Sequence, residues 1–361
     1  MLKKQNQYEE AEHLTGSALR VVAIGGGTGL STLLRGLKQF VAKPGIESDS
    51  EMARIADLTA VVTVTDDGGS SGLLRKEFNI LPPGDIRNCI VALSEDEALL
   101  ARLFQFRFPA ESALNGHNFG NLFLTALTSM TNDFAEAVKL SSEVLATRGR
   151  IFPATTANVQ LEALMNDGSR EYGETNITAS TKRIVQLQMV PANAAPLTDT
   201  LEAIARADLI TIGPGSLFTS LIPNVLVHGI PEAIAASSAV KVFVCNLMTE
   251  ANESLGLTAA GHIRAIYAHA GCPIFDYALV NSIPVSHETR TKYAKEGAEQ
   301  ILADVDAIES LGVKPVLGDY LDETGVARHA TDRVAHDVMR ILYSEYSRRR
   351  SLARVAATPE D

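Results

Sequence analysis

ALRVVAIGGGTGLSTLLRGLKQF, residues 18–40, is the stretch that decides the fold. It is continuously apolar over residues 21–24, which is typical of a β-strand covered on both faces. Four glycines follow within residues 25–29, and leucines then recur at the spacing of an amphipathic helix. The stretch therefore predicts a strand, a tight glycine turn and a helix.

The same alternation returns later in the chain. Apolar runs at residues 58–64, 208–212, 241–248 and 277–282 predict further strands, and helical patterns lie between most of them. Strands that alternate with helices form a mainly parallel sheet with helices on its faces. We therefore predict an α/β fold built on a Rossmann-like, doubly wound, mainly parallel sheet.

Two regions depart from this alternation. Residues 73–145 carry helical patterns and few strand signals, so they predict a helical insertion. Short alternating runs follow in residues 150–178, where Asp167 and Gly168 form an Asp-Gly pair that favours a tight turn. These runs predict a small β-hairpin region.

One domain accounts for the patterned part of the chain. We expect it to span residues 17–343, between a flexible arm at residues 1–16 and a flexible, frayed tail at residues 344–361. Residues 43–57 are polar and predict an exposed insertion or a short surface helix.

Charge and composition narrow the class of protein. Of the 361 residues, 46% are hydrophobic and 21% charged, as in ordinary soluble globular proteins. The net charge of −11 argues against a nucleic-acid partner, which would require a basic surface. No apolar run approaches the ~20 residues needed for a membrane span. The first residues lack a signal peptide's apolar core, and the three cysteines are scattered, so we expect a cytoplasmic protein.

Two glycine turns mark the expected ligand site. The first comprises Gly25, Gly26, Gly27, Thr28 and Gly29, and the second carries Gly213, Gly215, Ser216 and Thr219. Each turn follows an expected strand and opens a helix, where free N–H groups attract anions and glycine admits a ligand close to the backbone. Either turn alone is also compatible with a tight structural connection. Two on one sheet predict a shared cleft for a phosphate-bearing ligand.

TDDGGSSG, residues 65–72, follows the second expected strand. At that place a carboxylate of Asp66 or Asp67 can hold a ribose hydroxyl, and the other can hold Mg²⁺ beside phosphates. The small residues that follow can form a nest of N–H groups for an anion. An exposed turn with local hydrogen bonds is the structural alternative.

Two loops before helices add polar candidates. Asn88 in PPGDIRN, and Asn118 and Asn121 in GHNFGN, can offer amides to a base or a phosphate, although helix capping is an equally good explanation of such loops. His117 is a candidate general acid or base, and Asp67 is a second candidate. The sequence assigns no catalytic residue.

Five segments stand out together: GGGTGLSTLLRGLK, TVTDDGGSSGLLRKE, PPGDIRN, GHNFGNL and GPGSLFTSLIPNVLV. They resemble the bacterial gluconeogenesis-factor (YvcK-type) family, which is related to the CofD-like 2-phospho-L-lactate transferases. The resemblance runs from Val21 to Ile341, and residues 43–57 are longer than the family usually carries.

The resemblance implies a function as well as a fold. It implies binding of UDP-sugars such as UDP-N-acetylglucosamine, and support of cell-wall growth and cell shape on gluconeogenic carbon sources. It also implies ligand contacts from Tyr293, whose ring can cover a base or sugar, and from Arg328, whose guanidinium can grip a diphosphate.

Three functions remain open at this point. The first is a regulatory factor that binds a UDP-sugar without turning it over and acts on an unidentified protein partner. The second is a 2-phospho-L-lactate-type transferase with a nucleotide-activated donor and a deazaflavin acceptor. The third is an NAD(H)-binding oxidoreductase, which the incomplete dinucleotide fingerprint at Leu30 disfavours. The wider match to the family favours the first, and a homo-oligomer is compatible with all three.

Overall fold

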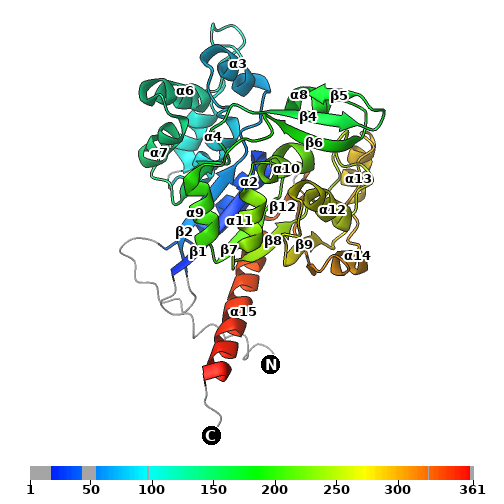
Figure 1. Ribbon diagram of the computed structural model, residues 1–361. Coiled ribbons are helices and arrows are strands. Elements are labelled where there is room, and N and C mark those ends of the chain that lie inside the picture. The colour runs from blue at the N-terminus through cyan, green and yellow to red at the C-terminus, as the bar shows by residue number, and fades with distance from the viewer. Residues whose placement is uncertain (1–17, 43–53, 96, 324, 358–361) are drawn as a thin grey trace.

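A seven-stranded sheet forms the centre of the molecule (Figure 1). The computed structural model describes residues 18–42, 54–95, 97–323 and 325–357. The strands of the sheet are β1 (Ala18–Gly25), β2 (Arg54–Val62), β3 (Arg150–Pro153), β7 (Leu209–Ile212), β8 (Val240–Val244), β9 (Tyr277–Asn281) and β10 (Lys314–Gly318). Their order is β10-β9-β8-β7-β1-β2-β3, and every neighbouring pair is parallel. The predicted Rossmann-like sheet is confirmed.

The core lies on both faces of the central strands. The last five residues of β1 and all four residues of β7 are buried, which explains their continuous apolar runs. Helix α2 (Gly27–Lys38) buries its leucines against the same core. At Gly36 the long C-terminal helix α15 (Thr331–Ala357) packs so close that an added Cβ would lie 2.6 Å from the Cβ of Ala335. A side chain at position 36 would therefore separate the two helices.

The direction of winding reverses at the centre of the sheet. From β1 the chain passes through α2 to β2 on one side, whereas from β7 it passes to β8 on the other. The second connection comprises the π-helix η2 (Leu217–Leu221), α10 (Ile222–Val225) and α11 (Ile230–Ala236). Because such crossovers are right-handed, opposite directions place the two sets of helices on opposite faces of the sheet. β1 and β7 thus flank the point where the strand order reverses.

The predicted helical insertion lies between β2 and β3. It consists of α3 (Gly69–Phe78), α4 (Gly84–Leu93), α5 (Glu97–Gln105), α6 (Phe119–Thr131) and α7 (Phe134–Val144). The predicted hairpin region follows β3 as a small antiparallel sheet of order β5-β4-β6. Its elements are β4 (Gln160–Met165), β5 (Arg170–Tyr172), α8 (Glu174–Ala179) and β6 (Ile184–Val190). The expected Asp-Gly turn joins β4 to β5, with Gly168 at a φ of +83°.

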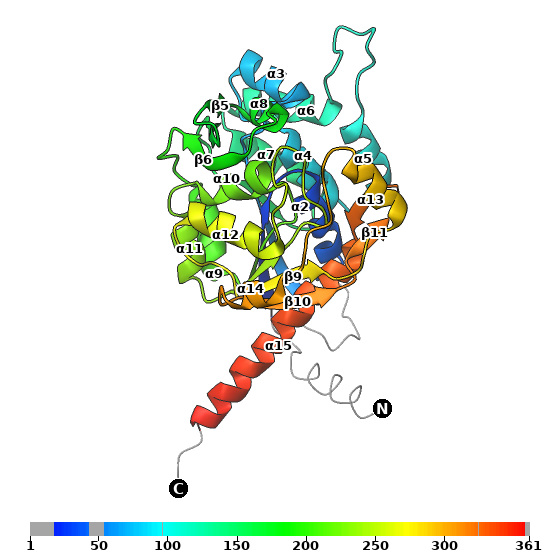
Figure 2. The ribbon, with the colours of Figure 1, turned by 90° about the vertical axis from the view of Figure 1, so that its right-hand side faces the viewer.

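The remaining elements complete the helical layers and one edge of the sheet. They are α9 (Thr198–Arg206), α12 (Ala259–Ala270), α13 (His287–Ala294), α14 (Val305–Glu309), β11 (Leu321–Glu323) and β12 (Ala327–His329). β11 and β12 form a two-stranded antiparallel ribbon that leads into α15. Figure 2 shows this ribbon beside α13, whose Lys292 donates to the Gly325 carbonyl at 2.7 Å.

The C-terminal segment differs from the expected frayed tail. Instead of ending near residue 344, α15 continues to Ala357 and projects from the body (Figures 1 and 2). Polar contacts hold it to the sheet: the Tyr277 hydroxyl donates to Glu345 at 2.5 Å, and Arg349 donates to the Ser238 carbonyl at 2.8 Å. These contacts join residues far apart in sequence, so the local composition did not reveal them.

Two expected surface segments fall largely outside the described residues. These are the N-terminal arm at residues 1–16 and the part of the predicted insertion at residues 43–53. Residues 54–57, which were expected in that insertion, form the start of β2. The prediction therefore placed the beginning of the second strand four residues too late.

Helix length and composition bear on the expected absence of a membrane span. Over the ranges given above, no single helix is long and apolar enough to cross a membrane. The segments Leu217–Val225 and Ile230–Ala236 reach that length and composition only together, and they are bent by 74°.

Candidate ligand-binding cleft

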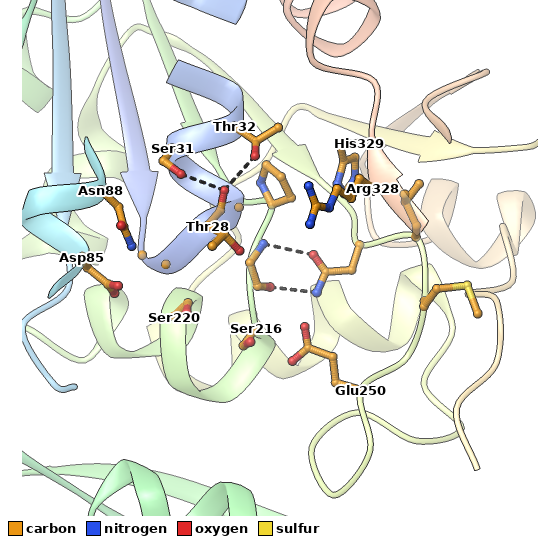
Figure 3. A pocket seen from close by; sticks show the side chains of 18 of the residues that line it. Thr28, Ser31, Thr32, Asp85, Asn88, Ser216, Ser220, Glu250, Arg328 and His329 are labelled. Atoms are coloured by element: carbon orange, nitrogen blue, oxygen red, sulfur yellow. Dashed lines mark hydrogen bonds between the residues drawn. The ribbon is translucent and has the colours of Figure 1, made fainter. Parts of the chain in front are cut away.

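A cleft of about 670 Å³ opens beyond the carboxyl ends of the central strands (Figure 3). Its lining includes the turn after β1, the turn after β7 and the loops after β2 and β8. This is the point where the strand order reverses. Open α/β sheets bind ligands at such a point, because the loops on its two sides diverge and leave a crevice.

The two glycine turns meet in one wall of the cleft. Gly26 is the N-cap of α2, and no acidic residue lies in the first turn of that helix, but Asp85 of α4 accepts a hydrogen bond from the Gly27 N–H. Gly29 lies so close to the second turn that an added Cβ would overlap the carbonyl of Pro214. Glycine at position 29 is therefore required for the two turns to touch.

Asparagine side chains hold both turns in place. Asn246, just after β8, accepts from the Gly215 N–H at 3.0 Å and donates to the Gly215 carbonyl at 2.8 Å. Buried Asn224 of α10 donates to the carbonyls of Gly25 at 3.3 Å and Ser220 at 2.8 Å. The Asn224 bonds fix the two turns relative to each other, and the Asn246 bonds occupy both backbone groups of Gly215.

Three carboxyl groups form an acidic wall beside the glycine turns. Asp66 follows β2, Asp85 lies in the first turn of α4, and Glu174 is the first residue of α8. Burial and then the negative charge of Asp66 raise the pKa of Asp85 to about 6. Burial and then the charges of Asp66 and Asp85 raise the pKa of Glu174 to about 8. Part of this wall is therefore protonated near neutral pH and can donate as well as accept hydrogen bonds.

The opposite side of the cleft is cationic and aromatic. Tyr293 of α13 and Arg328 and His329 of β12 line it. Among the described residues, the Arg328 guanidinium has no hydrogen bond or ion pair. The Nε2–H of His329 donates to the Cys245 carbonyl at 3.0 Å, and burial lowers the pKa of this histidine to about 4. Near neutral pH, Arg328 is thus the cation on this side of the cleft and His329 is neutral.

The cleft belongs to a chain with clear relatives. Residues 21–321 match the family model described as 2-phospho-L-lactate transferase CofD. The chain belongs to this family. It is 46% identical over 321 residues to the gluconeogenesis factor of Halalkalibacterium halodurans, covering 88% of this chain and 95% of the relative. It is 43% identical over 328 residues to the gluconeogenesis factor of Bacillus subtilis, covering 91% and 99% respectively.

Solved structures agree with this membership. A Bacillus halodurans protein described as a member of the upf0052 family shares 45% sequence identity with this CofD-family chain. The match has a TM-score of 0.83 and covers 90% of this chain and 99% of that one. A second crystal structure of protein BH3568 from Bacillus halodurans gives a TM-score of 0.84 at the same identity, covering 90% of this chain and 100% of that one. The family resemblance drawn from the five segments is confirmed.

In this CofD-family chain the cleft brings together most of the residues that the sequence singled out. Those that line it are Gly26, Gly27, Thr28, Gly29, Asp66, Asn88, Gly215, Ser216, Tyr293 and Arg328. Those that do not line it are Gly25, Asp67, His117, Asn118, Asn121, Gly213 and Thr219. Both candidate catalytic residues are in the second group.

The second group makes structural contacts instead. Asp67 accepts from the Thr175 N–H at 2.9 Å and from its hydroxyl at 2.6 Å, which joins the TDDGGSSG loop to α8. Nδ1 of His117 lies 3.3 Å from the Ser70 hydroxyl. Asn118 caps α6. The polar residues that the sequence singled out thus include several that hold loops and helix ends in place.

Sequence reasoning also missed residues that line the cleft. They are Ser31, Thr32, Arg35, Asp85, Gln105, Glu174, Pro214, Ser220, Asn246, Leu247, Met248, Thr249, Glu250, Ala327 and His329. A sequence signal existed for Asp85, in the first turn of a helix that follows PPG, and for Asn246, at the end of a strand. Glu174 had none, because the hairpin region that carries it reaches the cleft only through the tertiary fold.

Proposed function

We propose that this chain binds a nucleotide sugar such as UDP-N-acetylglucosamine in the cleft and acts as a regulatory factor in the cytoplasm. In this role it would link carbon metabolism to cell-wall synthesis and cell shape through a protein partner. Two relatives whose sequences match this chain over 95% and 99% of their length are named gluconeogenesis factors, which supports the metabolic part of the proposal. The observation that carries the binding part is the meeting of two glycine turns opposite an unpaired arginine.

Each end of such a ligand has a chemically matched partner. The diphosphate suits the N–H groups at the start of α2 other than that of Gly27, which donates to Asp85, and the guanidinium of Arg328, which can form a bidentate contact. The Tyr293 ring can cover the base or the sugar. Hydroxyl groups suit the acidic wall, because Asp66 accepts hydrogen bonds and protonated Glu174 can also donate them. No covalent step is needed for this role.

Mg²⁺ fits the same cleft as a companion of the diphosphate. This ion takes one or two carboxylates and completes its shell with water and phosphate oxygens. Asp66 and Asp85 both line the cleft, whereas Asp67 is bound to Thr175. The described residues hold no ready-made group of three or more ligands for a metal. We therefore place Mg²⁺ beside Asp66 and Asp85 in the presence of nucleotide, where it would neutralise phosphate charge.

A transferase is the second candidate function. The matched family description names one, and the raised pKa of Asp85 to about 6 gives the cleft a carboxyl group able to take up a proton near neutral pH. Its donor would be a nucleotide-activated phosphate, and a deazaflavin would be the acceptor. NAD(H) binding is a third prediction. The titration with NADH described below distinguishes it from the regulatory and the transferase functions.

Calorimetry and mass spectrometry together test the proposal. Full-length protein is titrated with UDP-N-acetylglucosamine, GDP and NADH, each with and without Mg²⁺. We expect saturable binding of the UDP-sugar, and a gain of about 2.7 kcal/mol in stability at a hundredfold excess over Kd. Mass spectrometry should find the nucleotide unchanged after hours. Release of UDP or UMP would instead favour the transferase, and no binding of any UDP-sugar at millimolar concentration would refute the proposal.

A further inference from the structure

The cleft extends well past the glycine turns along one face of α2. Thr28, Ser31, Thr32 and Arg35 all line it, and their spacing of three or four residues places them on one side of the helix. From Thr28 to Arg35 this face runs about 10 Å, at 1.5 Å per residue. The hydroxyls of Ser31 and Thr32 donate to the Thr28 carbonyl, at 3.0 and 2.8 Å (Figure 3). Their oxygen lone pairs are left for the cleft.

Arg35 is a cation with no partner among the described residues. Its guanidinium makes no hydrogen bond or ion pair there, and it is neither fully exposed nor buried. Other arginine side chains around the sheet are paired; Arg150, for example, pairs with Asp57. An arginine aimed into a cleft without a counter-charge is a group held ready for an anion.

The facing wall supplies hydrogen-bond donors. Asn88 of α4 accepts from Arg87 through its carbonyl oxygen at 2.8 Å, so its NH₂ group is left to donate into the cleft. Gln105, the last residue of α5, adds a second amide. Behind them lies buried Arg87, and the charge of Arg107 helps lower the pKa of Arg87, after burial. Along α4 the lining therefore changes from the carboxyl group of Asp85 to the amide of Asn88 within one turn, and α2 adds the guanidinium group of Arg35 to the same cleft.

We propose that Arg35, Asn88 and Gln105 form a second subsite, which takes a carboxylate or phosphate group beyond the nucleotide diphosphate. The planar guanidinium and the two amide groups provide the donors that such an anion needs. This inference rests on the proposed nucleotide-sugar site for its geometry. The anion has two sources: an acidic group on the nucleotide sugar itself, or a separate small acid bound beside it.

Matched ligands distinguish these two sources. UDP-glucuronate and UDP-glucose differ by one carboxylate, and 3-phosphoglycerate carries both kinds of acidic group without a nucleotide. Calorimetry of full-length protein should show at least one acid bound about fivefold more tightly than its neutral counterpart, UDP-glucose or glycerol. A gain with UDP-glucuronate identifies an acidic sugar; binding of 3-phosphoglycerate, alone or with UDP-glucose present, identifies a separate acid.

Arg35 variants decide whether this subsite is responsible. Arg35→Gln should abolish the fivefold preference, Arg35→Lys should keep part of it, and Arg264→Gln, an exposed change on α12 outside the cleft, should leave it intact. Binding of UDP-glucose should be unchanged by all three. Acid binding that is absent, or that is equal in wild type and Arg35→Gln, would overturn the subsite even if UDP-sugars bind. Conversely, Arg35-dependent binding of 3-phosphoglycerate without any UDP-sugar binding would refute the proposed function and leave the subsite standing.

Discussion

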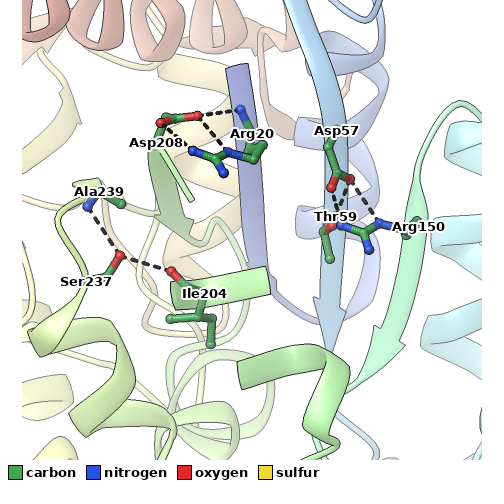
Figure 4. A network of polar contacts seen from close by, with 8 residues as sticks. All are labelled: Arg20, Asp57, Thr59, Arg150, Ile204, Asp208, Ser237 and Ala239. Atoms are coloured by element: carbon green, nitrogen blue, oxygen red, sulfur yellow. Dashed lines mark hydrogen bonds and ion pairs between the residues drawn. The ribbon is translucent and has the colours of Figure 1, made fainter. Parts of the chain in front are cut away.

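The pairing of charged side chains differs between the two edges of the central sheet. At the amino ends of the strands, two ion pairs join neighbouring elements: Arg20 donates to Asp208 at 3.3 Å through Nε, and Arg150 donates to Asp57 at 3.0 Å (Figure 4). These two pairs tie β1 to the start of β7 and β2 to β3. At the same edge, the Ser237 hydroxyl donates to the Ile204 carbonyl of α9 at 3.0 Å.

At the carboxyl ends, several charged groups that line the cleft are left without such partners. Arg35 and Arg328 line the cleft with no ion pair among the described residues. Burial, and then the negative charge of Asp66, raise the pKa values of Asp85 and Glu174. Unpaired and mutually repelling charges reduce stability, so a fold retains them where they contribute to binding. The comparison teaches that pairing, more than the presence of charge, separates structural from functional residues in this sheet.

The largest expected effect is at the glycine contact that joins the two turns. Gly29→Ala should lower the free energy of unfolding by about 2 kcal/mol and weaken UDP-N-acetylglucosamine binding at least tenfold, because the new Cβ overlaps the Pro214 carbonyl. Urea unfolding and calorimetry measure the two quantities. Gly261→Ala is the matched control, since its Cβ would meet atoms at 3.4 Å and it also lies in a helix. Equal effects of the two substitutions would contradict the close approach of the turns.

Next in size is the loss of the unpaired cation opposite those turns. Arg328→Ala should weaken UDP-N-acetylglucosamine binding by about 1.5–3 kcal/mol, or about 10- to 150-fold, through loss of a charge-assisted hydrogen bond. Stability should stay the same, because Arg328 contributes no ion pair to the described fold. Calorimetry of Arg290→Ala, an exposed change on α13 outside the cleft, provides the control. If Arg328→Ala lowered stability and left UDP-N-acetylglucosamine affinity unchanged, Arg328 would be a structural residue and the contrast between the two edges would fail.

A smaller effect concerns the pH dependence of stability. Glu174 has a pKa of about 8 in the folded protein against 4.5 for an ordinary glutamate, so the native state holds its proton over a range where the unfolded chain has lost it. Stability should therefore fall as pH rises from 4.5 to about 8. Glu174→Gln should flatten this part of the profile, as measured by urea unfolding at several pH values. Glu232→Gln, in the first turn of α11, should keep the wild-type slope; an unflattened profile for Glu174→Gln would show that its carboxyl group is not perturbed.

The smallest effect is expected at the amino edge. Arg20→Met should reduce stability by about 0.5 kcal/mol, because the Arg20–Asp208 pair is partly exposed and is weakened by salt. Ligand affinity should not change. Unfolding in low and high salt tests the electrostatic origin, and calorimetry tests the second part. If Arg20→Met altered UDP-N-acetylglucosamine affinity, the amino edge would be coupled to the cleft and the two edges could no longer be treated separately.

Much of the fold was predictable because its signals are local. The strand, glycine turn and helix at residues 18–40 lie within one short stretch, so their apolar spacing alone indicates their form. Two such turns on a parallel sheet must also lie at the same edge, which predicted the cleft. By contrast, residues 344–361 were expected to form a frayed tail, because the contacts that hold Glu345 and Arg349 come from Tyr277 and Ser238, which are distant in the chain.

The sequence by itself determined the sheet, the two glycine turns and the acidic loop after β2, since each depends on neighbouring residues. Only the tertiary structure decided which side chains of those loops face the cleft. Asp66 lines it while Asp67 binds Thr175, and Ser220 lines it while its neighbour Thr219 does not. The reason is physical: the direction of a side chain in a loop or a helix turn is set by what packs behind it, and those partners come from elements that are remote in sequence.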